Sequence, residues 1–239
     1  MRHYGIIGNP LEHSFSAKYF NEKFATFGID AEYSLYPIDE EEWKKGERLN
    51  ELLRTLDGFN VTYPYKQRII PYLDELDETA KKIGAVNVVH HRKGYNTDYI
   101  GFVHALQPLL RNDRKALVLG TGGASKAVCM GLKQLGIIPT LVSRSTGQEA
   151  LRYNELTRDI MEAHTLIINC TPLGMFPDVD SCPDIPYEQI TAQHLLFDCV
   201  YNPDQSLFLR KGKAQGARTQ NGIDMLIGQA KEAWKIWNL

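Results

Sequence analysis

The sequence of 239 residues has few of the features that mark metal-binding or disulfide-rich proteins. Its four cysteines, Cys129, Cys170, Cys182 and Cys199, are widely spaced and form no C-x-x-C pair. Its seven histidines form no H-E-x-x-H motif. Because disulfide frameworks and metal sites need closely patterned side chains, this spacing favours free buried thiols, and we expect no metal.

Long apolar runs and blocks of like charge are missing as well. No run approaches the roughly 20 apolar residues that a membrane span needs. The 27 Lys and Arg residues nearly balance the 29 Asp and Glu residues, so no excess of one charge favours nucleic acid or an anionic membrane. We therefore expect a cytoplasmic protein whose partner is a small molecule. The pattern does not distinguish a monomer from a homodimer, and both are kept as expectations.

The first hundred residues alternate short apolar runs with helical patterns. Strands are predicted at 4–8, 31–38 and 57–62, and helices at 16–28 and 40–56. The segment 86–98 predicts a hairpin or a strand that turns at Lys93-Gly94. Such regular alternation is typical of a sheet with crossover helices.

The second half contains apolar runs that are nearly continuous. Strands are predicted at 115–120, 139–145, 164–171 and 194–200, and helices at 99–110, 124–136 and 222–239. Continuous apolar strands are typical of a parallel sheet that is covered on both faces.

The segment KALVLGTGGASKAV, residues 115–128, predicts a strand, a glycine turn and a helix. Gly120 suits the tight turn, and Gly122 lets the backbone approach a pyrophosphate. Ser125 takes the third small position, and the helix N-terminus offers unpaired N–H groups. A purely structural turn is the alternative, but the strand that follows at the distance of a βαβ unit favours a nucleotide-binding loop.

The end of that following strand indicates which dinucleotide binds. A NAD site typically has an acidic residue there, whereas this chain has Ser143-Arg144-Ser145. A guanidinium flanked by two hydroxyls suits a 2′-phosphate, so NADP is favoured over NAD. The alternative is that Arg144 is an ordinary solvated residue.

Polar residues also follow the predicted strands of the first half. Ser14 and Ser16 precede a helix; one of them could serve as the N-cap, which leaves a second hydroxyl for a carboxylate ligand. The other candidates are Asn60, Thr62, Lys66, Asn87 and Asp98. Each has an ordinary explanation by itself, but together they lie where open α/β sheets bind ligands.

Nine short motifs along the chain together resemble those of a known family. In chain order they are GNPLEHSFS, GFNVTYPYK, IGAVNV, GYNTDYIGF, GTGGASKAV, SRS, NCTPLGM, DCVYNP and GIDMLIGQA. In this order they resemble the shikimate dehydrogenase family, and the resemblance runs nearly from end to end.

The resemblance implies a role for each candidate residue. Lys66 and Asp98 would be catalytic. The substrate would be bound by Ser14, Ser16, Asn60, Thr62, Asn87, Tyr201 and Gln229. NADP would be bound by Gly120, Thr121, Gly122, Gly123, Ala124, Ser125, Ser143, Arg144, Ser145, Asn169, Thr171, Met175, Cys199 and Gly222.

The resemblance also implies an architecture and a reaction. Two α/β domains would face a cleft: a substrate domain, residues 1–100 completed by helix 222–239, and a Rossmann-like NADP domain, residues 101–215. The enzyme would reduce 3-dehydroshikimate to shikimate in aromatic amino-acid biosynthesis, with Lys66 as the acid and base and Asp98 orienting it. Alternatives are a quinate/shikimate or aminoshikimate dehydrogenase of the same family, or a non-catalytic sensor of shikimate and NADP.

Overall fold

The structure is a computed structural model that describes residues 1–11, 14–144 and 150–238. The chain divides into two compact units. The first contains Met1–Thr97 and Ala230–Leu239, and the second contains Asp98–Gln229. Within the described residues, no helix is long and apolar enough to cross a bilayer.

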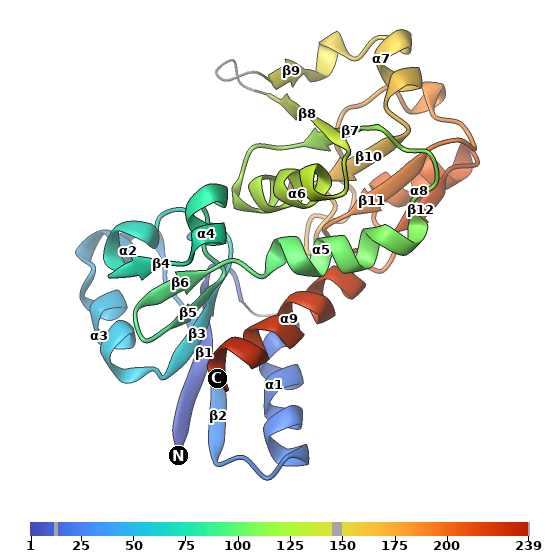
Figure 1. The fold of residues 1–239 in the computed structure, drawn as a ribbon. Helices are drawn as coiled ribbons and strands as arrows, with labels where there is room; N and C mark the ends of the chain where they lie inside the picture. The colour runs from blue at the N-terminus through green and yellow to red at the C-terminus, as the bar shows by residue number, and fades with distance from the viewer. Residues whose placement is uncertain (12–13, 145–149, 239) are drawn as a thin grey trace. The chain divides into compact units, whose positions relative to one another are not determined.

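The first unit is built on a mixed six-stranded sheet in the order β2-β1-β3-β5-β6-β4 (Figure 1). Its strands are β1 (Arg2–Gly8), β2 (Ala31–Pro37), β3 (Gly58–Val61), β4 (Glu75–Leu76), β5 (Val88–His90) and β6 (Lys93–Tyr95). Its helices are α1 (Phe15–Thr26), α2 (Glu40–Lys45), α3 (Glu47–Thr55) and α4 (Glu78–Ile83), with a 3₁₀ turn at Ile70–Tyr72. The strand β1 is parallel to β2 and β3, whereas β5 is antiparallel to β3 and β6.

The second unit is built on a six-stranded parallel sheet in the order β12-β11-β10-β7-β8-β9. Its strands are β7 (Lys115–Leu119), β8 (Ile138–Ser143), β9 (Ala150–Arg152), β10 (Leu166–Asn169), β11 (Leu195–Asp198) and β12 (Arg218–Gln220). Its helices are α5 (Asp98–Leu106), α6 (Gly123–Gln134), α7 (Arg158–Ala163) and α8 (Leu207–Ala214), with 3₁₀ turns at Gln107–Leu109, Tyr153–Glu155 and Tyr187–Gln189. In chain order the strands are arranged 3-2-1-4-5-6, which is the order of a Rossmann fold.

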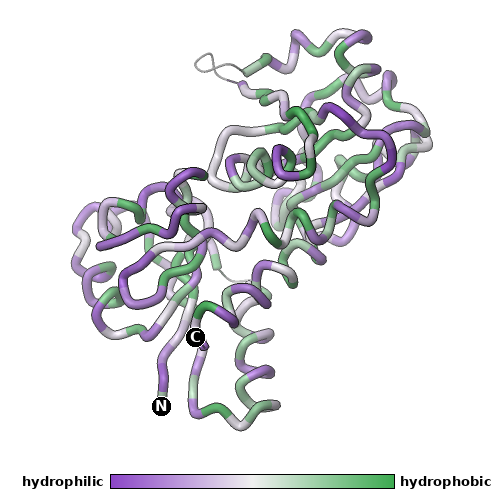
Figure 2. The backbone as a smooth tube through the Cα atoms, in the orientation of Figure 1, coloured by the Kyte–Doolittle hydropathy of each residue, from purple (hydrophilic) through white to green (hydrophobic). Residues whose placement is uncertain are grey.

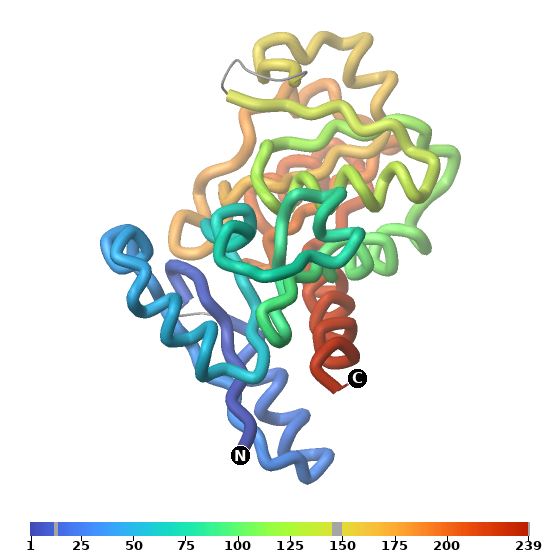
Figure 3. The backbone as a smooth tube through the Cα atoms, turned by 60° about the vertical axis from the view of Figure 1, so that its left-hand side comes forward, coloured from blue at the N-terminus to red at the C-terminus, as the bar shows by residue number. Residues whose placement is uncertain are grey.

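The last helix, α9 (Ile223–Trp237), contributes residues to both units (Figure 3, red). In the first unit, Trp237 donates a hydrogen bond from Nε1 to the carbonyl oxygen of Val89 at 3.2 Å. The ring of Trp237 also covers Gly58, where an added Cβ would lie 2.5 Å from its Nε1 atom. The C-terminal turns of α9 therefore complete the core of the first unit.

Each unit has its own apolar core on both faces of its sheet, and Figure 2 shows hydrophobic stretches of chain, in green, within each unit. In the first unit, Ile7, Trp43 and Phe59 belong to one core cluster, and Tyr4 and Phe20 belong to the other. In the second unit, β7, β10 and β11 are buried along nearly their whole length. Burial on both faces explains why the sequence pattern of these strands is nearly continuous rather than alternating.

Two local predictions were wrong. The predicted helix at 40–56 is two helices, because Gly46 adopts a left-handed backbone (φ +73°) that ends α2 and precedes α3. The predicted hairpin turns at His91 and Arg92, which have φ values of +47° and +59°, so Lys93 and Gly94 lie in β6. Non-glycine residues rarely adopt such φ values, and the Lys-Gly pair therefore gave a misleading turn signal.

Candidate active site

In the first unit, several strand ends meet at one edge of the sheet. The parallel strands β1 and β3 end there, the antiparallel strand β5 begins there, and β6 ends there. Thr62 follows β3 and donates its backbone N–H to the carbonyl of Ile7 at 2.9 Å. The backbone N–H of Val86 donates to the carbonyl of Lys66 at 2.7 Å, so the Lys66 segment is attached to the same edge.

Tyr65, the residue before Lys66, holds the backbone of this segment through contacts in the buried core. Tyr65 is 1% exposed, and its hydroxyl donates to the carbonyl of Ile38 at 2.6 Å. Its ring stacks on Trp43 with a centroid distance of 3.9 Å and an interplanar angle of 5°. Lys66 itself is half-buried, so part of its side chain remains accessible to solvent or ligand.

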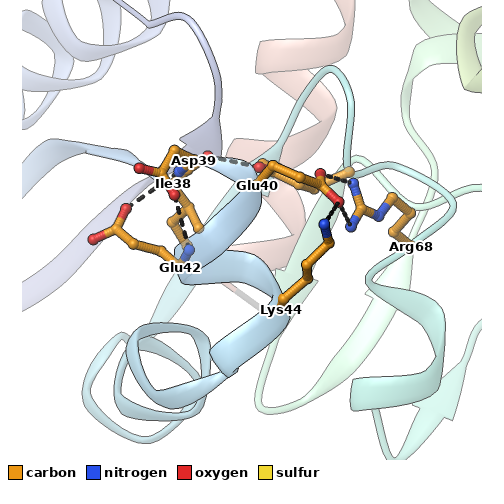
Figure 4. Close-up of polar contacts among 7 residues, drawn as sticks. Ile38, Asp39, Glu40, Glu42, Lys44 and Arg68 are labelled. Carbon is orange, nitrogen blue, oxygen red and sulfur yellow. Dashed lines mark hydrogen bonds and ion pairs between the residues drawn. The ribbon is translucent and has the colours of Figure 1, made fainter.

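Arg68 holds the same segment through contacts at the protein surface. Its guanidinium makes two hydrogen bonds to the Glu40 carboxylate, at 2.6 and 3.1 Å, and Figure 4 shows Lys44 approaching the same carboxylate. The guanidinium also lies 5.1 Å from the ring centroid of Trp43 and 5.3 Å from that of Tyr65. The bidentate geometry and the ring contacts give this surface pair more orienting power than an ordinary exposed ion pair.

A buried amide network joins the strand ends on either side of this segment. Asn87 donates from Nδ2 to the Thr97 hydroxyl at 3.0 Å and accepts from the Thr97 backbone N–H at 2.7 Å. The carbonyl of Asn87 accepts from Asn60 Nδ2 at 3.1 Å and from the Val61 backbone at 2.9 Å. Asn60, Asn87 and Thr97 are each less than 5% exposed, so these polar groups are held in fixed orientations.

Ser14 and Ser16 lie at the N-terminus of α1. Ser14 occupies the N-cap position, but its side chain makes no capping hydrogen bond. Ser16 is 5% exposed. Burial raises the pKa of the neighbouring Tyr33, and the Ser16 hydroxyl acts in the opposite direction. Neither hydroxyl is therefore used to cap the helix, which is the ordinary role that the sequence had left open.

In the second unit, the glycine turn lies between β7 and α6. Gly120 has φ +106°, and an added Cβ would lie 3.1 Å from the Thr171 methyl group. Gly122 is the N-cap of α6, and an added Cβ there would meet nothing within 4 Å, so the backbone is open on that side. Ser125 is buried and donates from Oγ to the Gly122 carbonyl at 2.7 Å. Thr121 is exposed beside them, while Gly123 and Ala124 begin α6.

The turn lies where the strand order of the sheet reverses, between β7 and β10. Open α/β sheets bind ligands outside the carboxyl ends of strands at such a point. At the end of β10, the Asn169 carboxamide oxygen accepts from the backbone N–H and the hydroxyl of Thr171, at 3.0 and 2.6 Å. The structure therefore brings Gly120, Asn169 and Thr171 together at this edge.

Asp198, at the end of β11, orients Asn169. Its fully buried carboxylate accepts from Asn169 Nδ2 at 2.9 Å, from the Val200 backbone at 3.0 Å and from the Ser206 hydroxyl. Burial raises the pKa of Asp198 to about 6, although hydrogen bonds from Ser206, Val200 and Asn169 act in the opposite direction. These bonds connect Asp198 to the end of β10, to the residues that follow β11 and to the N-cap of α8.

Cys199 and Gly222 lie beside this carboxylate. The Cys199 backbone N–H donates to the Asn169 carbonyl at 2.9 Å, and an added Cβ at Gly222 would overlap the Cys199 carbonyl. Tyr201 follows two residues later and is half-buried. Met175 lies in the loop after β10, where its backbone N–H donates to the carbonyl of Pro172 at 3.1 Å. The residues predicted for the nicotinamide side thus come from the end of β10 and the loop after it, from the position directly after β11 and from the position directly before α9.

The residues predicted to bind the 2′-phosphate follow β8. Ser143 ends that strand and is 8% exposed, whereas Arg144 is exposed. Ser145 lies outside the described residues. Burial raises the pKa of Tyr153 to about 12, against the opposing charge of Arg144 nearby.

Two more predicted residues lie on α5 and α9. Asp98 begins α5 and is 5% exposed. Gln229 is 7% exposed and donates from Nε2 to the Leu226 carbonyl at 2.9 Å. The two helices pack closely in the second unit, because an added Cβ at Gly228 would lie 2.9 Å from the Gly101 Cα atom.

Comparisons with known proteins extend over nearly the whole chain. A family model described as the shikimate dehydrogenase substrate binding domain matches residues 6–89. The shikimate dehydrogenase (NADP(+)) of Clostridium beijerinckii is 38% identical, over 99% of this chain and 92% of the relative. The chain belongs to the shikimate dehydrogenase family.

Solved structures of family members confirm the predicted fold class of two α/β domains with a Rossmann-like second domain. The shikimate dehydrogenase of Aquifex aeolicus superposes with a TM-score of 0.88 at 34% identity, covering 100% of this chain and 92% of that one. That of Thermus thermophilus, solved in complex with NADP(H) and shikimate, gives a TM-score of 0.86 at 31% identity, covering 99% and 93%.

Sequence reasoning missed two buried residues that contact the predicted site of this shikimate dehydrogenase family member. Asp198 stands in the motif DCVYNP, but only Cys199 and Tyr201 were taken from it. Tyr33 stands in the strand pattern AEYSLYPI, where it is one of several apolar positions. The position of Asp198 directly after an apolar strand was the available signal; for Tyr33 the sequence offered none.

The contact of Gly101 with α9 leads to a stability prediction. Exchanging glycine for alanine inside a helix normally stabilises by about 0.5–1 kcal/mol. At Gly101 the new Cβ would overlap the Met225 carbonyl oxygen and lie 2.7 Å from the Gln229 nitrogen. We therefore expect Gly101→Ala to lower the free energy of unfolding by about 1–3 kcal/mol, measured by urea denaturation.

The control is His104→Ala, an exposed position on the same helix. It should leave the unfolding midpoint nearly unchanged. If Gly101→Ala were as stable as wild type, α5 and α9 would be able to move apart at this contact without lowering the free energy of unfolding.

Proposed function

We propose that this chain is an NADP-dependent shikimate dehydrogenase that reversibly reduces 3-dehydroshikimate to shikimate in aromatic amino-acid biosynthesis. The observation that carries the proposal is similarity along the whole chain to enzymes named shikimate dehydrogenase (NADP(+)). A relative solved with NADP(H) and shikimate resembles the chain in both units. The geometry of each unit supports the same conclusion.

The residues around the glycine turn fit a dinucleotide. The backbone beside Gly122 is open, Gly120 holds the turn, and α6 begins at Gly123 with its N–H groups available for phosphate. When bound, NADPH supplies the hydride that reduces the C3 carbonyl. Asn169, Thr171, Met175, Cys199 and Gly222 would line its nicotinamide side.

Lys66 would act as the acid in reduction and as the base in oxidation. Negative charge develops on the carbonyl oxygen as the carbon is reduced, and a positioned ammonium group both stabilises that charge and donates a proton. The contacts of Tyr65 and Arg68 hold the backbone on either side of Lys66. Asp98 would orient the ammonium group.

The remaining polar residues of the first unit would orient the substrate. The hydroxyls of Ser14 and Ser16, at a helix N-terminus, would bind the carboxylate. Asn60, Thr62 and Asn87 would bind the ring hydroxyls, with Tyr201 and Gln229 completing the set. Fixed amides favour one orientation of the ring, which places a single carbonyl at Lys66.

A comparison of initial rates tests the proposal. The purified chain would oxidise shikimate or quinate with NADP or NAD, and cofactor absorbance would report turnover. Turnover with NADP and shikimate that exceeds the other three combinations would support the proposed function. Faster turnover of quinate would indicate a quinate/shikimate enzyme, and NADP binding without turnover of either acid would indicate a sensor.

Arg144 gives a prediction about cofactor choice. A charge-assisted hydrogen bond contributes about 1.5–3 kcal/mol, which corresponds to roughly 10- to 100-fold in affinity. We expect Arg144→Ala to raise the KM for NADP by about that factor and to leave the KM for NAD nearly unchanged. Arg158→Ala, whose side chain is 81% exposed on α7, is the control. An equal loss for both cofactors would contradict a contact with the 2′-phosphate.

We also propose that the protein acts in the cytoplasm, as monomer or homodimer. The four cysteines are free thiols, which suits a reducing compartment. Light scattering of the purified chain would distinguish the two oligomeric states.

A further inference from the structure

The phenol of Tyr33 lies among the residues proposed to bind substrate, although it has no assigned part in the reaction. Tyr33 is on β2 and is 2% exposed. Its hydroxyl donates to the Asn60 carboxamide oxygen at 2.7 Å. Burial raises the pKa of Tyr33 well above its usual range, so the hydroxyl remains protonated and able to donate.

The backbone of Tyr33 is held as firmly as its hydroxyl. The Asn21 side chain, on α1, accepts from the Tyr33 backbone N–H and donates to its carbonyl, both at 2.9 Å. The ring stacks on Phe20 with a centroid distance of 4.8 Å and an interplanar angle of 18°. The strand β2, the helix α1 and the aromatic core therefore hold the hydroxyl of Tyr33 in a fixed position.

These contacts determine which way the Asn60 amide faces. Its oxygen accepts from Tyr33, and one N–H of its Nδ2 donates to the Asn87 carbonyl at 3.1 Å. An amide has two N–H donors and two oxygen lone pairs, so one donor and one lone pair of Asn60 are left for a ligand. A rotated amide would set its oxygen against the Asn87 carbonyl, and it would lose the hydrogen bond that its oxygen accepts from the Tyr33 hydroxyl.

We propose that Tyr33 is a positioning residue for substrate: its hydroxyl fixes the Asn60 amide so that the second N–H of Asn60 faces a ring hydroxyl. The inference rests on the proposed function and deepens it. The hydroxyl acts through Asn60, and we assign it no contact with the reacting atoms. A buried hydroxyl needs partners in any case, so the experiment must separate positioning from stability alone.

The test compares Tyr33→Phe with Tyr4→Phe. Tyr4 is the cross-strand neighbour of Tyr33, is also 2% exposed and packs in the same aromatic core. Its hydroxyl interacts with the Arg2 side chain and, within the described part of the chain, with none of the predicted substrate residues. Both substitutions keep the ring, so both variants should fold, and thermal unfolding would confirm this.

We expect Tyr33→Phe to raise the KM for shikimate about tenfold, which corresponds to the loss of one ordinary buried hydrogen bond. The KM for NADP should stay within about twofold of wild type, because the cofactor residues lie in the second unit. Tyr4→Phe should leave both KM values unchanged even if its unfolding temperature falls by the same amount.

A double-mutant cycle tests the route through Asn60. If Tyr33 acts through this amide, Tyr33→Phe should have no further effect on the KM for shikimate in an Asn60→Ala background. Combined with Ser14→Ala, its effect should be fully retained. An unchanged KM in Tyr33→Phe, or an undiminished effect without Asn60, would overturn the inference. A wild-type chain that does not turn over shikimate would overturn the proposed function and this inference with it, so the two failures are distinguishable.

Discussion

Replacing Lys66 with methionine is expected to reduce kcat for shikimate oxidation by about 10²–10⁴, because general acid and base catalysis typically contributes that factor. Methionine keeps an unbranched stem of similar length and removes the ammonium group. The neighbouring anchors, Tyr65 and Arg68, do not depend on that charge. Steady-state rates with saturating NADP and calorimetric binding of shikimate would separate loss of chemistry from loss of binding.

A second variant separates charge from proton transfer. Lys66→Arg keeps a cation, but arginine does not release a proton in proteins. It should therefore lose nearly as much kcat as Lys66→Met while binding shikimate more tightly than that variant. Lys82→Met, an exposed position on α4, is the control and should be fully active. A loss of less than about tenfold, about 1.4 kcal/mol, in Lys66→Met would rule out Lys66 as the proton donor.

Asp198→Asn is expected to change how stability depends on pH. The pKa of Asp198 is about 6 in the folded chain against an ordinary value of 3.8, chiefly because burial disfavours the charged form. Between these values the folded protein binds more protons than the unfolded one. The free energy of unfolding of wild type should therefore fall, relative to Asp198→Asn, by about 3 kcal/mol as the pH rises through this interval.

Urea unfolding at pH values from about 3 to about 7 measures this difference. Below pH 3.8 the contribution is fully present, and above about pH 6 it is lost and the gap between the two proteins becomes constant. Asparagine can still accept from Asn169 and Val200, so the variant should fold. A gap that does not vary with pH would show that Asp198 has no raised pKa.

The Ser206 hydroxyl provides a matched change. Its hydrogen bond lowers the pKa of Asp198. Ser206→Ala should therefore move the pH-dependent interval upward. It should also cost about 1 kcal/mol at every pH, because Ser206 caps α8 through the Leu209 backbone.

Much of the fold follows from local pattern. The apolar runs before Gly120 and Arg144 were placed as strands because parallel strands buried on both faces leave an unbroken apolar signal. The turn at Gly120 was recognisable because only glycine adopts its backbone conformation without strain. Short elements such as β4, β9 and β12 were not predicted, since two or three residues are too few to show a period.

The site was predictable only where the residue type itself suggested chemistry. Lys66 and Asp98 were identified by charge at strand ends, within motifs that resemble a family. Tyr33 contacts Asn60 across 27 residues of sequence, and this contact depends on the register of β1, β2 and β3. Local sequence does not encode such register, so a buried phenol that orients a distant amide becomes visible only in three dimensions.

The shared helix α9 has a consequence for synthesis on the ribosome. Trp237 donates a hydrogen bond to Val89, which lies 148 positions earlier in the sequence. Ala230 and Ala233 pack in the same core as Tyr4. At about 5–20 residues per second, the first unit waits on the order of ten seconds for these partners to be translated. The nascent chain thus exposes an aromatic surface while the second unit emerges, which makes the first unit, not the Rossmann-like one, the expected client of chaperones during translation.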